Sequence, residues 1–480
     1  MNRRHFLRLA GGGAAALACG GVQLLTSCGD GGTGPGSGVT RTPLPVPSTL
    51  TPTGATLTAA PGTATIASGE TTPAWLFNGL LPSPTIRVRR GDTATIHLVN
   101  GIPEPTIVHW HGLIVPHEDD GHPLDAIDPG GSYDYDFPIV QRAGTLWYHP
   151  HPHGLTGGQV QRGLAGFFLV GDDEEDALAL PSGEQEILLL LQDRAADAAH
   201  AFEYAPTADD LHTGILRDTA YGDGVRRPTV RVAGPRCRLR VLNASNARIY
   251  RLGLGNGAPL TVIGNDGGLL ASPVQIDSVY LGVAERIDLL IDLTGVAVEG
   301  GLMLESLAFD MTAAPSGSTQ GVEMELLEIV RAPGGDATAP PLPSTLSTIA
   351  PLGSPAGERE FAFQSSASGH THTINGLTYD MNRVDEQIAL GRVERWRFRN
   401  DSALPHPVHL HGTHFQVESR EGGRGTVYPY EGGWKDTVLV MPLELVSVLV
   451  RFDPYRGVFP LHCHNMQHED QGMMLNIEVV

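Results

Sequence analysis

The densest group of metal-binding side chains lies within twelve residues near the C-terminus. It contains His462, Cys463, His464, His468 and Met473. A blue-copper electron-transfer centre takes two imidazoles and one thiolate in a plane, with a long axial thioether. Zinc sites contain more thiolates or a closed tetrahedron of strong ligands. This segment therefore predicts a copper site at Cys463.

The order of the histidine-cysteine-histidine triplet predicts where the metals lie. In an extended strand successive side chains point to opposite faces, so His462 and His464 share one face and Cys463 points to the other. Adjacent Cα atoms are only about 3.8 Å apart. An electron that reaches Cys463 would have a short covalent route to either histidine. We interpret the triplet as a wire between two copper sites.

Three further His-X-His pairs occur upstream, in HWHG, WYHPHPHG and HPVHLHGTHF. They are His109/His111, His149/His151 and His409/His411. Each pair can present two imidazoles on one strand face. A single pair on a surface strand is more often solvated than metallated, but four pairs supply eight imidazoles. These are enough to hold three copper ions with positions open for dioxygen. His406, in the last of these motifs, is the natural missing imidazole for the copper at Cys463.

These four segments resemble the copper-binding motifs of the multicopper oxidases, the laccase-like family. The resemblance extends over nearly all of the mature chain, through Asn78 to Asp92, Arg238 to Leu252, Ile263 to Leu270 and Thr373 to Asn382. The chain looks most similar to the bacterial three-domain laccases and the copper-efflux oxidases. No ligand position departs from the family pattern, whereas some relatives have lost ligands and act without copper.

The resemblance implies four copper ions per chain, one of type 1, one of type 2 and two of type 3. It places the type 1 ion on His406, Cys463 and His468, with Met473 axial. The type 2 ion takes His109 and His409. One type 3 ion takes His111, His149 and His464, and the other takes His151, His411 and His462.

Two carboxylates are predicted to serve this cluster. Reducing dioxygen to water consumes protons as well as electrons, so a buried cluster needs a proton supply. Asp120 and Glu469 resemble acidic residues that family members use as proton relays, and such carboxylates also orient ligating imidazoles. The alternative is that Asp120 lies in an acidic surface loop and that Glu469 bonds only locally. We favour the functional interpretation for both.

The remaining histidines and cysteines are predicted to bind no metal. His117, His122, His153 and His414 lie near the motifs, and His370/His372 form a fifth pair in a Ser/Gly-rich segment where exposure explains them. Cys237 lies in an alternating, strand-like run and is predicted to be a small core residue. Because Cys19 and Cys28 lie in the N-terminal signal and Cys463 would bind copper, we expect no intramolecular disulfide.

The N-terminus predicts export. Arg3-Arg4 followed by an apolar, glycine-rich stretch is typical of a twin-arginine signal over residues 1–28, and not of a membrane helix. The twin-arginine machinery carries folded proteins, which suits a metalloenzyme. Residues 25–28 also resemble a lipoprotein cleavage box. Cys28 would then carry a lipid and anchor the protein, or ordinary cleavage would release it. We expect a periplasmic or cell-surface location.

The body of the chain is predicted to be all-β. About 450 residues follow the signal, which suggests three domains of about 150 residues each, and alternating strands with Gly/Pro turns recur throughout. The resemblance implies cupredoxin-like Greek-key β-sandwiches. We expect a linker over 29–48, domains over 49–172 and 173–332, a second linker over 333–358, and a last domain over 359–480 with the type 1 copper.

The predicted ligands fall only in the first and last domains. The trinuclear cluster should therefore lie between these two domains, with the middle domain as a spacer and a wall of the substrate cleft. The formal charge of −21 disfavours nucleic acid and anionic membranes, and it would mildly concentrate cationic reductants. Membrane contact is expected only through the lipid anchor.

The predicted activity is oxidation of phenols or aromatic amines coupled to the reduction of dioxygen to water. The alternative is a metallo-oxidase for cuprous or ferrous ions in copper tolerance. Such enzymes carry methionines over the type 1 site, but no methionine lies between Met324 and Met381, and residues 402–405 contain neither methionine nor aspartate. Because cuprous ion prefers thioethers, the phenol oxidase is favoured. A copper-storing or envelope-assembly protein without turnover is a third hypothesis, which missing ligands would favour.

Overall fold

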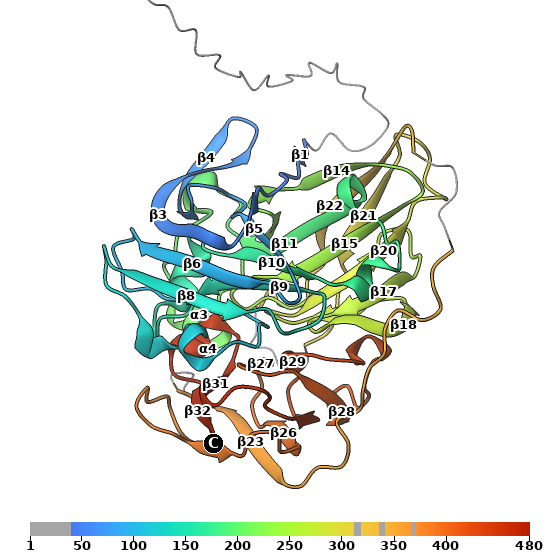
Figure 1. The fold of residues 1–480 in the computed structure, drawn as a ribbon. Helices are drawn as coiled ribbons and strands as arrows, with labels where there is room; N and C mark the ends of the chain where they lie inside the picture. The colour runs from blue at the N-terminus through green and yellow to red at the C-terminus, as the bar shows by residue number, and fades with distance from the viewer. Residues whose placement is uncertain (1–39, 312–317, 336–340, 367–370) are drawn as a thin grey trace, which may run out of the picture. The chain divides into compact units, whose positions relative to one another are not determined.

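The strands form three β-sandwiches of two sheets each. The computed structural model describes residues 40–311, 318–335, 341–366 and 371–480. Within these residues, six sheets pack in pairs along the chain. Figure 1 shows the first pair in blue and cyan, the middle pair in green and yellow, and the last in orange and red. The prediction of an all-β protein with three cupredoxin-like sandwiches is confirmed. The predicted export signal, Cys28 and His370 lie outside the described residues.

The first sandwich packs the sheet β2-β5-β10-β9-β7 against the sheet β4-β3-β6-β8. Strand β6 shows why such segments are extended, because Ala94, Ile96 and Leu98 alternate inward and the residues between them are partly exposed. Leu98 and Phe168 from the two sheets share one core. The strands are β2 (Thr49–Leu50), β3 (Thr53–Ala67), β4 (Glu70–Phe77), β5 (Thr85–Arg89), β6 (Thr93–Asn100), β7 (Val108–His109), β8 (Ser132–Pro138), β9 (Gly144–Pro150) and β10 (Gly166–Gly171). The helices are η1 (His117–Asp119), η2 (Pro123–Asp125) and α1 (Thr156–Gln161).

The middle sandwich packs the sheet β13-β12-β11-β15-β20-β17-β18 against the sheet β1-β14-β22-β21-β16-β19. Cys237 is buried in its core, as predicted. The strands are β1 (Thr42–Pro43), β11 (Glu186–Arg194), β12 (Thr219–Gly222), β13 (Val225–Arg226), β14 (Pro228–Ala233), β15 (Arg236–Asn243), β16 (Tyr250–Leu254), β17 (Leu260–Asn265), β18 (Gly268–Ile276), β19 (Val279–Leu281), β20 (Arg286–Asp292), β21 (Gly301–Ser306) and β22 (Met324–Ala332). The helices are α2 (Asp173–Asp176), η3 (Gly183–Gln185), η4 (Ala198–His200) and α3 (Ala208–Thr213).

The last sandwich packs the sheet β24-β23-β26-β30-β28 against the sheet β25-β32-β31-β27-β29. In β26 the large apolar residues Trp396 and Phe398 point into the core, and arginines lie between them. The strands are β23 (Glu358–Ser365), β24 (His372–Ile374), β25 (Glu386–Ile388), β26 (Glu394–Asn400), β27 (His406–Leu410), β28 (Phe415–Gly422), β29 (Thr437–Val440), β30 (Glu444–Val450), β31 (Gly457–Cys463) and β32 (Met474–Val479). The helices are η5 (Pro429–Glu431) and α4 (Met466–Asp470).

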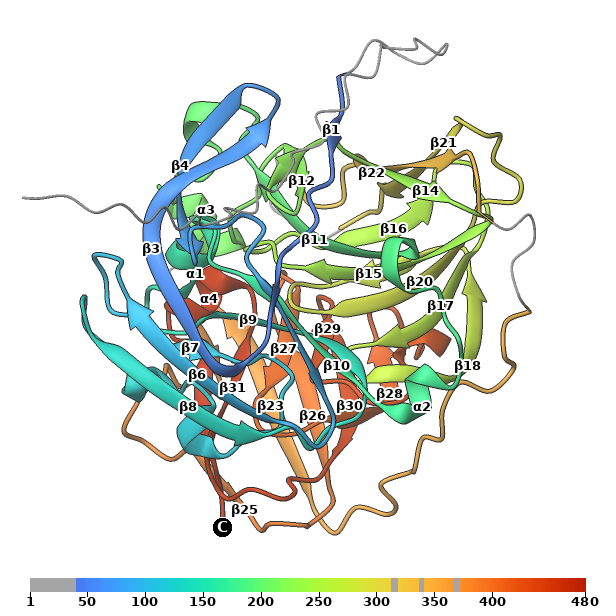
Figure 2. The same ribbon diagram turned by 45° about the horizontal axis from the view of Figure 1, so that its top comes forward.

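The three sandwiches share buried surface. Every residue of β9 is buried, because one face packs in its own sandwich and the other faces the neighbouring sandwiches. One cluster joins Trp147 of the first sandwich, Leu242 of the middle one and Met466 of the last. Figure 2 shows α1, α3 and α4, one from each sandwich, side by side. The joint between the sandwiches therefore has a hydrophobic core of its own, beside those of the three sandwiches.

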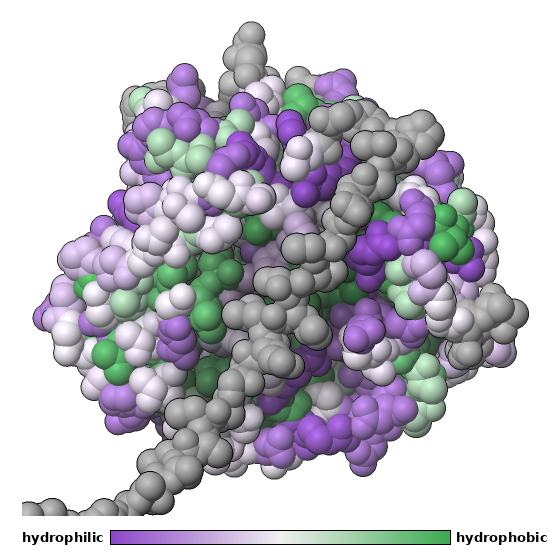
Figure 3. Space-filling view, turned by 90° about the horizontal axis from the view of Figure 1, so that it is seen from above, coloured by the Kyte–Doolittle hydropathy of each residue, from purple (hydrophilic) through white to green (hydrophobic). Residues whose placement is uncertain are grey.

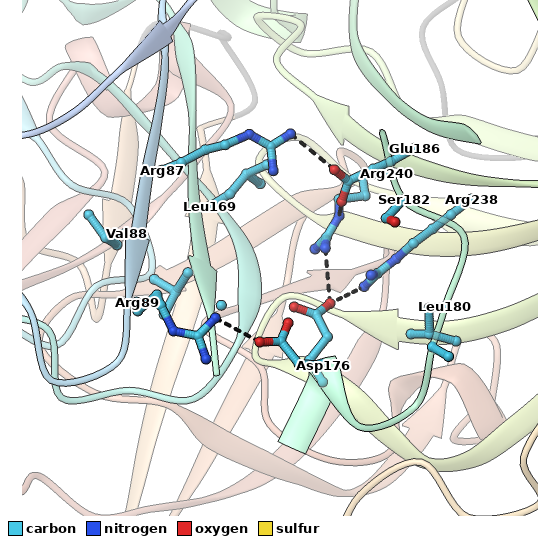
Figure 4. A pocket seen from close by; sticks show the side chains of 14 residues that line it. Arg87, Val88, Arg89, Leu169, Asp176, Leu180, Ser182, Glu186, Arg238 and Arg240 are labelled. Carbon is cyan, nitrogen blue, oxygen red and sulfur yellow. Dashed lines mark hydrogen bonds and ion pairs between the residues drawn. The ribbon is translucent and has the colours of Figure 1, made fainter. Parts of the chain in front are cut away.

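Ion pairs close the joint between the first and middle sandwiches. They line a pocket of about 350 Å³. Figure 4 shows that Arg87 and Arg240 converge there on Glu186. The nitrogen–oxygen distances to Glu186 are 3.0 Å from Arg87 and 2.7 Å from Arg240. Arg238 binds Asp288 with two contacts of 3.0 Å. Because these guanidinium groups already have carboxylate partners, we interpret the pocket as part of the domain joint.

Parts of the predicted linkers have fixed places on the middle sandwich. Strand β1 pairs with β14, and Leu346 is buried against Ile263 and Leu290. In the described part of the chain, no helix has the length and apolar character needed to cross a bilayer. Figure 3 shows a face covered mainly by hydrophilic side chains, with hydrophobic ones in the hollow between them. The acidic composition thus accompanies a largely polar surface on this side.

Candidate metal centre

Four neighbouring strands and the residues that directly follow them carry the predicted histidine pairs. In the first sandwich β7 pairs with β9, so that His109 lies opposite His149. In the last sandwich β27 pairs with β31, so that His409 lies opposite His462 and Val408 lies opposite Cys463. Figure 2 shows β7 and β9 beside β27 and β31. The histidine pairs of the two sandwiches therefore face one another across the joint.

The triplet at the end of β31, of which His464 directly follows the strand, divides between two environments, as the strand periodicity predicts. Cys463 is buried in the core of the last sandwich. His462 and His464 point to the opposite face, where their rings lie near those of His409, His411 and His149. One strand thus carries groups from both predicted copper sites on its two faces.

The Cys463 side of the strand holds a compact three-ligand set. Cys463 Sγ lies 3.3 Å from His406 Nδ1 and 3.6 Å from His468 Nδ1, and the two Nδ1 atoms are 3.3 Å apart. The opposite ring nitrogens are occupied: His406 Nε2 contacts Ser402 Oγ at 2.8 Å, and His468 Nε2 donates to the His212 carbonyl at 2.9 Å. His468 therefore presents an unprotonated Nδ1 toward the sulfur, and His406 does the same when its Nε2 donates to Ser402 Oγ.

The electrostatics of this set fit a bound cation. Burial raises the pKa of the Cys463 thiol and lowers the pKa of His406 to about 3. A neutral imidazole is the form that binds a metal, and a metal deprotonates a coordinated thiol outright. Met473 is fully buried in the same core, and its backbone carbonyl accepts a hydrogen bond from the Cys463 amide at 3.1 Å.

The opposite side of β31 gathers eight imidazoles. All eight are at most 1% exposed. Three sets have their ring nitrogens within 4.8 Å of one another: His109 with His111 and His149, His109 with His409 and His411, and His151 with His411 and His462. The ring of His464 completes the cluster, with its centroid 5.0 Å from that of His111 and 5.1 Å from that of His149.

The hydrogen bonds show that lone pairs face one another in this cluster. His109 Nδ1 donates to the Asp120 carbonyl at 2.7 Å, and His409 Nδ1 donates to the Asp436 carbonyl at 2.9 Å. The two Nε2 atoms, only 3.3 Å apart, therefore both present lone pairs. Burial lowers the pKa of His409 well below its ordinary value, so this ring is neutral.

The same pattern recurs around His411 and His462. Their Nε2 atoms are 3.1 Å apart, and His411 Nδ1 donates to Asp120 Oδ2 at 2.7 Å. Other buried nitrogens have no hydrogen-bond partner: His111 Nδ1, His149 Nε2, His151 Nδ1 and both nitrogens of His464. Buried lone pairs without donors are unfavourable, and bound cations remove this cost. The donor set therefore fits copper.

Asp120 and Glu469 both lie against this cluster. Asp120 is fully buried, which contradicts the alternative of a solvated surface loop, and its Oδ1 has no hydrogen-bond partner. Glu469 lies 3.2 Å from His462 Nδ1 and 3.6 Å from His151 Nε2. Burial alone would raise the pKa of Glu469, but His462 and His151 hold it below its ordinary value.

Comparisons with known proteins identify the family. Models of multicopper oxidase domains match residues 58–175 and 353–480. The bilirubin oxidase of Albifimbria verrucaria is 32% identical over 414 residues, which cover 83% of this chain and 71% of that protein. The chain belongs to the multicopper oxidase family.

This multicopper oxidase is also similar to two proteins of different description. The McoA multicopper oxidase from the hyperthermophile Aquifex aeolicus has 33% identity and a TM-score of 0.84, over 92% of this chain and all of that one. The cell division protein FtsP of Dickeya dadantii is 31% identical over 99% of this chain and 98% of its own length. The chain is thus similar over most of its length both to proteins named as oxidases and to one named as a cell division protein.

The middle sandwich of this multicopper oxidase reaches the histidine cluster, which the sequence did not predict. Asp436 Oδ1 lies 3.0 Å from His111 Nε2, and Arg286 Nη1 donates to the same oxygen at 2.7 Å. Arg286 also donates to the carbonyls of Thr145 and Ala284, both at 2.9 Å. One guanidinium group therefore joins all three sandwiches.

The charge of Arg286 holds Asp436 ionised. Burial alone would raise the pKa of Asp436, but Arg286 outweighs burial and the pKa lies well below the ordinary aspartate range. Two features of the sequence could have indicated this ion pair. Lys435 and Asp436 directly precede the apolar strand β29, and Arg286 begins the largely apolar strand β20. A buried charge requires a partner, but the sequence did not show which partner.

The other histidines have varied surroundings. His122 Nε2 lies 3.0 Å from Asn476 Oδ1, His414 Nε2 donates to the Gly112 carbonyl at 2.8 Å, and His153 is exposed. The expectation that His372 is exposed is wrong. It lies in β24, is fully buried and stacks on the His468 ring with the centroids 3.9 Å apart. The Ser/Gly-rich composition before it did not reveal that β24 pairs with β23.

Proposed function

We propose that this multicopper oxidase takes single electrons from a small organic reductant at a type 1 copper and reduces dioxygen to water at a trinuclear copper cluster. The two faces of β31 carry this proposal: Cys463 joins His406 and His468 on one face, and His462 and His464 join six other imidazoles on the opposite face. The backbone of the triplet is the covalent link between the two sites.

The proposed ligands are the converging imidazole nitrogens, together with the sulfur atoms of Cys463 and Met473. The type 1 ion would be held by His406, Cys463 and His468, with Met473 axial, and the type 2 ion by His109 and His409. The type 3 ions would be held by His111, His149 and His464, and by His151, His411 and His462. Copper in these positions would supply one-electron chemistry at the thiolate and binding of dioxygen at the cluster.

The surrounding carboxylates would orient the imidazoles and handle protons. Asp120 Oδ2 accepts a hydrogen bond from His411 Nδ1, while Oδ1 has no hydrogen-bond partner and is available to bind a proton. Glu469 lies between His151 and His462 on the other side. We propose that both carboxylates pass protons toward the dioxygen site, because each is buried against imidazoles of the cluster.

Phenols and aromatic amines are the proposed reductants. No methionine lies between Met324 and Met381, which argues against a cuprous-ion site made of thioethers. The test compares oxygen consumption by the copper-loaded protein with 2,6-dimethoxyphenol, cuprous ion and ferrous ion. Faster turnover on the phenol supports this proposal, and faster turnover on either metal ion reverses the choice of reductant.

Turnover also distinguishes an oxidase from a copper-holding or structural protein. Oxygen consumption with any of these reductants supports the oxidase. Full copper loading without oxygen consumption would support a non-catalytic role.

We further propose export by the twin-arginine machinery to the periplasm or cell surface. The N-terminal Arg3-Arg4 and the apolar stretch after it support this proposal. Replacing both arginines by lysine should retain the protein in the cytoplasm, as cell fractionation would show. Labelling with a radioactive fatty acid, compared with a Cys28→Ala variant, distinguishes a lipid anchor from release.

A further inference from the structure

The copper-facing ring of His468 has no edge open to a reductant. Nδ1 faces Cys463, Nε2 donates to the carbonyl of His212 at 2.9 Å, and the side chain is fully buried. The flat face of the ring is covered by His372. A reductant at the protein surface therefore contacts other groups first.

The covering helix α3 is fixed to α4. The amide of Ile215 donates to Gln467 Oε1 at 2.9 Å, and Asn465 Nδ2 donates to the Thr213 carbonyl at 3.2 Å. Thr207 and Asp210 form a capping box at the start of α3. These contacts fix the His212 carbonyl against His468.

Three imidazoles form a stack that starts at His468. The ring centroids of His468 and His372 are 3.9 Å apart with an interplanar angle of 21°. Those of His372 and His212 are 5.9 Å apart with an angle of 23°. His372 Nδ1 contacts Ser365 Oγ at 2.8 Å, which holds the middle ring in place. His212, the outer ring, is partly exposed.

We infer that electrons enter this oxidase at His212 of the middle sandwich and reach His468 along two routes. One route runs from His212 through its own carbonyl and the hydrogen bond to His468 Nε2. The other runs through the stacked ring of His372. This inference rests on the proposed function and adds a docking position for the reductant.

The charge of the position fits a neutral or cationic donor, which the proposed phenols and aromatic amines include. Exposed Asp209 lies on the same helix as His212, so a neutral phenol or a cationic aromatic amine is favoured over an anion. In the transfer, the donor loses one electron and the type 1 site gains it. A phenol releases its proton to water, and no bond of His212 or His372 forms or breaks.

The test follows the anaerobic reduction of the copper-loaded protein by 2,6-dimethoxyphenol as bleaching of the blue absorption. The variants are His212→Ala, His372→Ala and His372→Phe, with His200→Ala as the control. His200 is an exposed histidine of the same sandwich, paired with Glu203. The reduction potential and the reoxidation rate with dioxygen are measured for each variant.

We expect His212→Ala to be reduced at least about tenfold more slowly, which is about 1.4 kcal/mol of activation free energy. His372→Ala should be slowed by a smaller factor, because the route through the His212 carbonyl remains. The potential, the reoxidation rate and the control should stay unchanged, and His372→Phe should retain most of the rate because it keeps a stacked ring.

Alanine variants that are reduced as fast as the parent, or slowed only through a shifted potential, overturn the inference. A phenylalanine variant as slow as His372→Ala overturns the stacked route. A parent protein that no reductant bleaches overturns the proposed function as well.

Discussion

Replacing Arg286 by glutamine removes the partner that holds Asp436 against the histidine cluster. Both side chains are fully buried. Asp436 would keep its contacts with His111 and Thr437 and the longer ones with His409 and His414, but it would lose its cationic partner. Removing one member of a buried ion pair costs about 3–5 kcal/mol of folding free energy. Mutation of the groups that orient a ligating histidine lowers metal affinity by about 10–100-fold, or about 1.4–2.8 kcal/mol, and Arg286 holds Asp436 in the position from which it contacts His111.

A comparison with Arg238→Gln separates the loss of folding stability from the loss of metal affinity. Arg238 is 4% exposed and pairs with Asp288 in the same sandwich, with no contact to a predicted ligand. Urea unfolding of the copper-free proteins should show a similar loss of stability for both variants. Copper titration against a chelator, with type 2 copper followed by electron paramagnetic resonance, should show weaker binding only for Arg286→Gln. Equal affinity of the two variants for the trinuclear copper would refute the positioning role of Arg286.

Three further changes test other parts of the structure. Cys463→Ser should abolish the blue absorption and turnover while copper analysis still finds most trinuclear copper; loss of all copper would contradict separate sites. Met473→Leu should raise the type 1 reduction potential, since the axial ligand tunes it, and an unchanged potential in redox titration would exclude Met473 as a ligand. Burial raises the pKa of Asp223, so the native state is stabilised at low pH and this stability is lost as the pH rises above about 4. Asp223→Asn keeps the bond from the Leu190 amide and should increase the free energy of unfolding more at pH 7 than at pH 4; a larger gain at pH 4 would contradict this sign.

Strand periodicity predicted much of the centre from sequence. Alternation along β31 placed Cys463 and His462 on opposite faces, and the structure has them so. The His-X-His pairs also came together, although in each pair only the first histidine lies within a strand and the second lies one or two residues past its end. Alternation is a local rule that needs no knowledge of how the sandwiches pack.

The parts that the sequence did not reveal depend on contacts between sandwiches. Arg286 meets Asp436 across 150 positions of sequence, and the carbonyl of His212 meets His468 across 256. His372 was expected to be exposed because its neighbours are small and polar, but β24 adds to the sheet beside His468. Neither the strand propensity of the residues nor the spacing of the motifs indicates such long-range packing.

The cluster of Trp147, Leu242 and Met466 should couple the unfolding of the three sandwiches, because each sandwich contributes a residue to it. Met466 lies only two residues before His468 and three after Cys463, so the chain that carries the thiolate is itself anchored in this shared core. An excised last sandwich would expose an apolar surface that the other two normally cover. Heating should consequently melt both metal centres and all three sandwiches together in one transition.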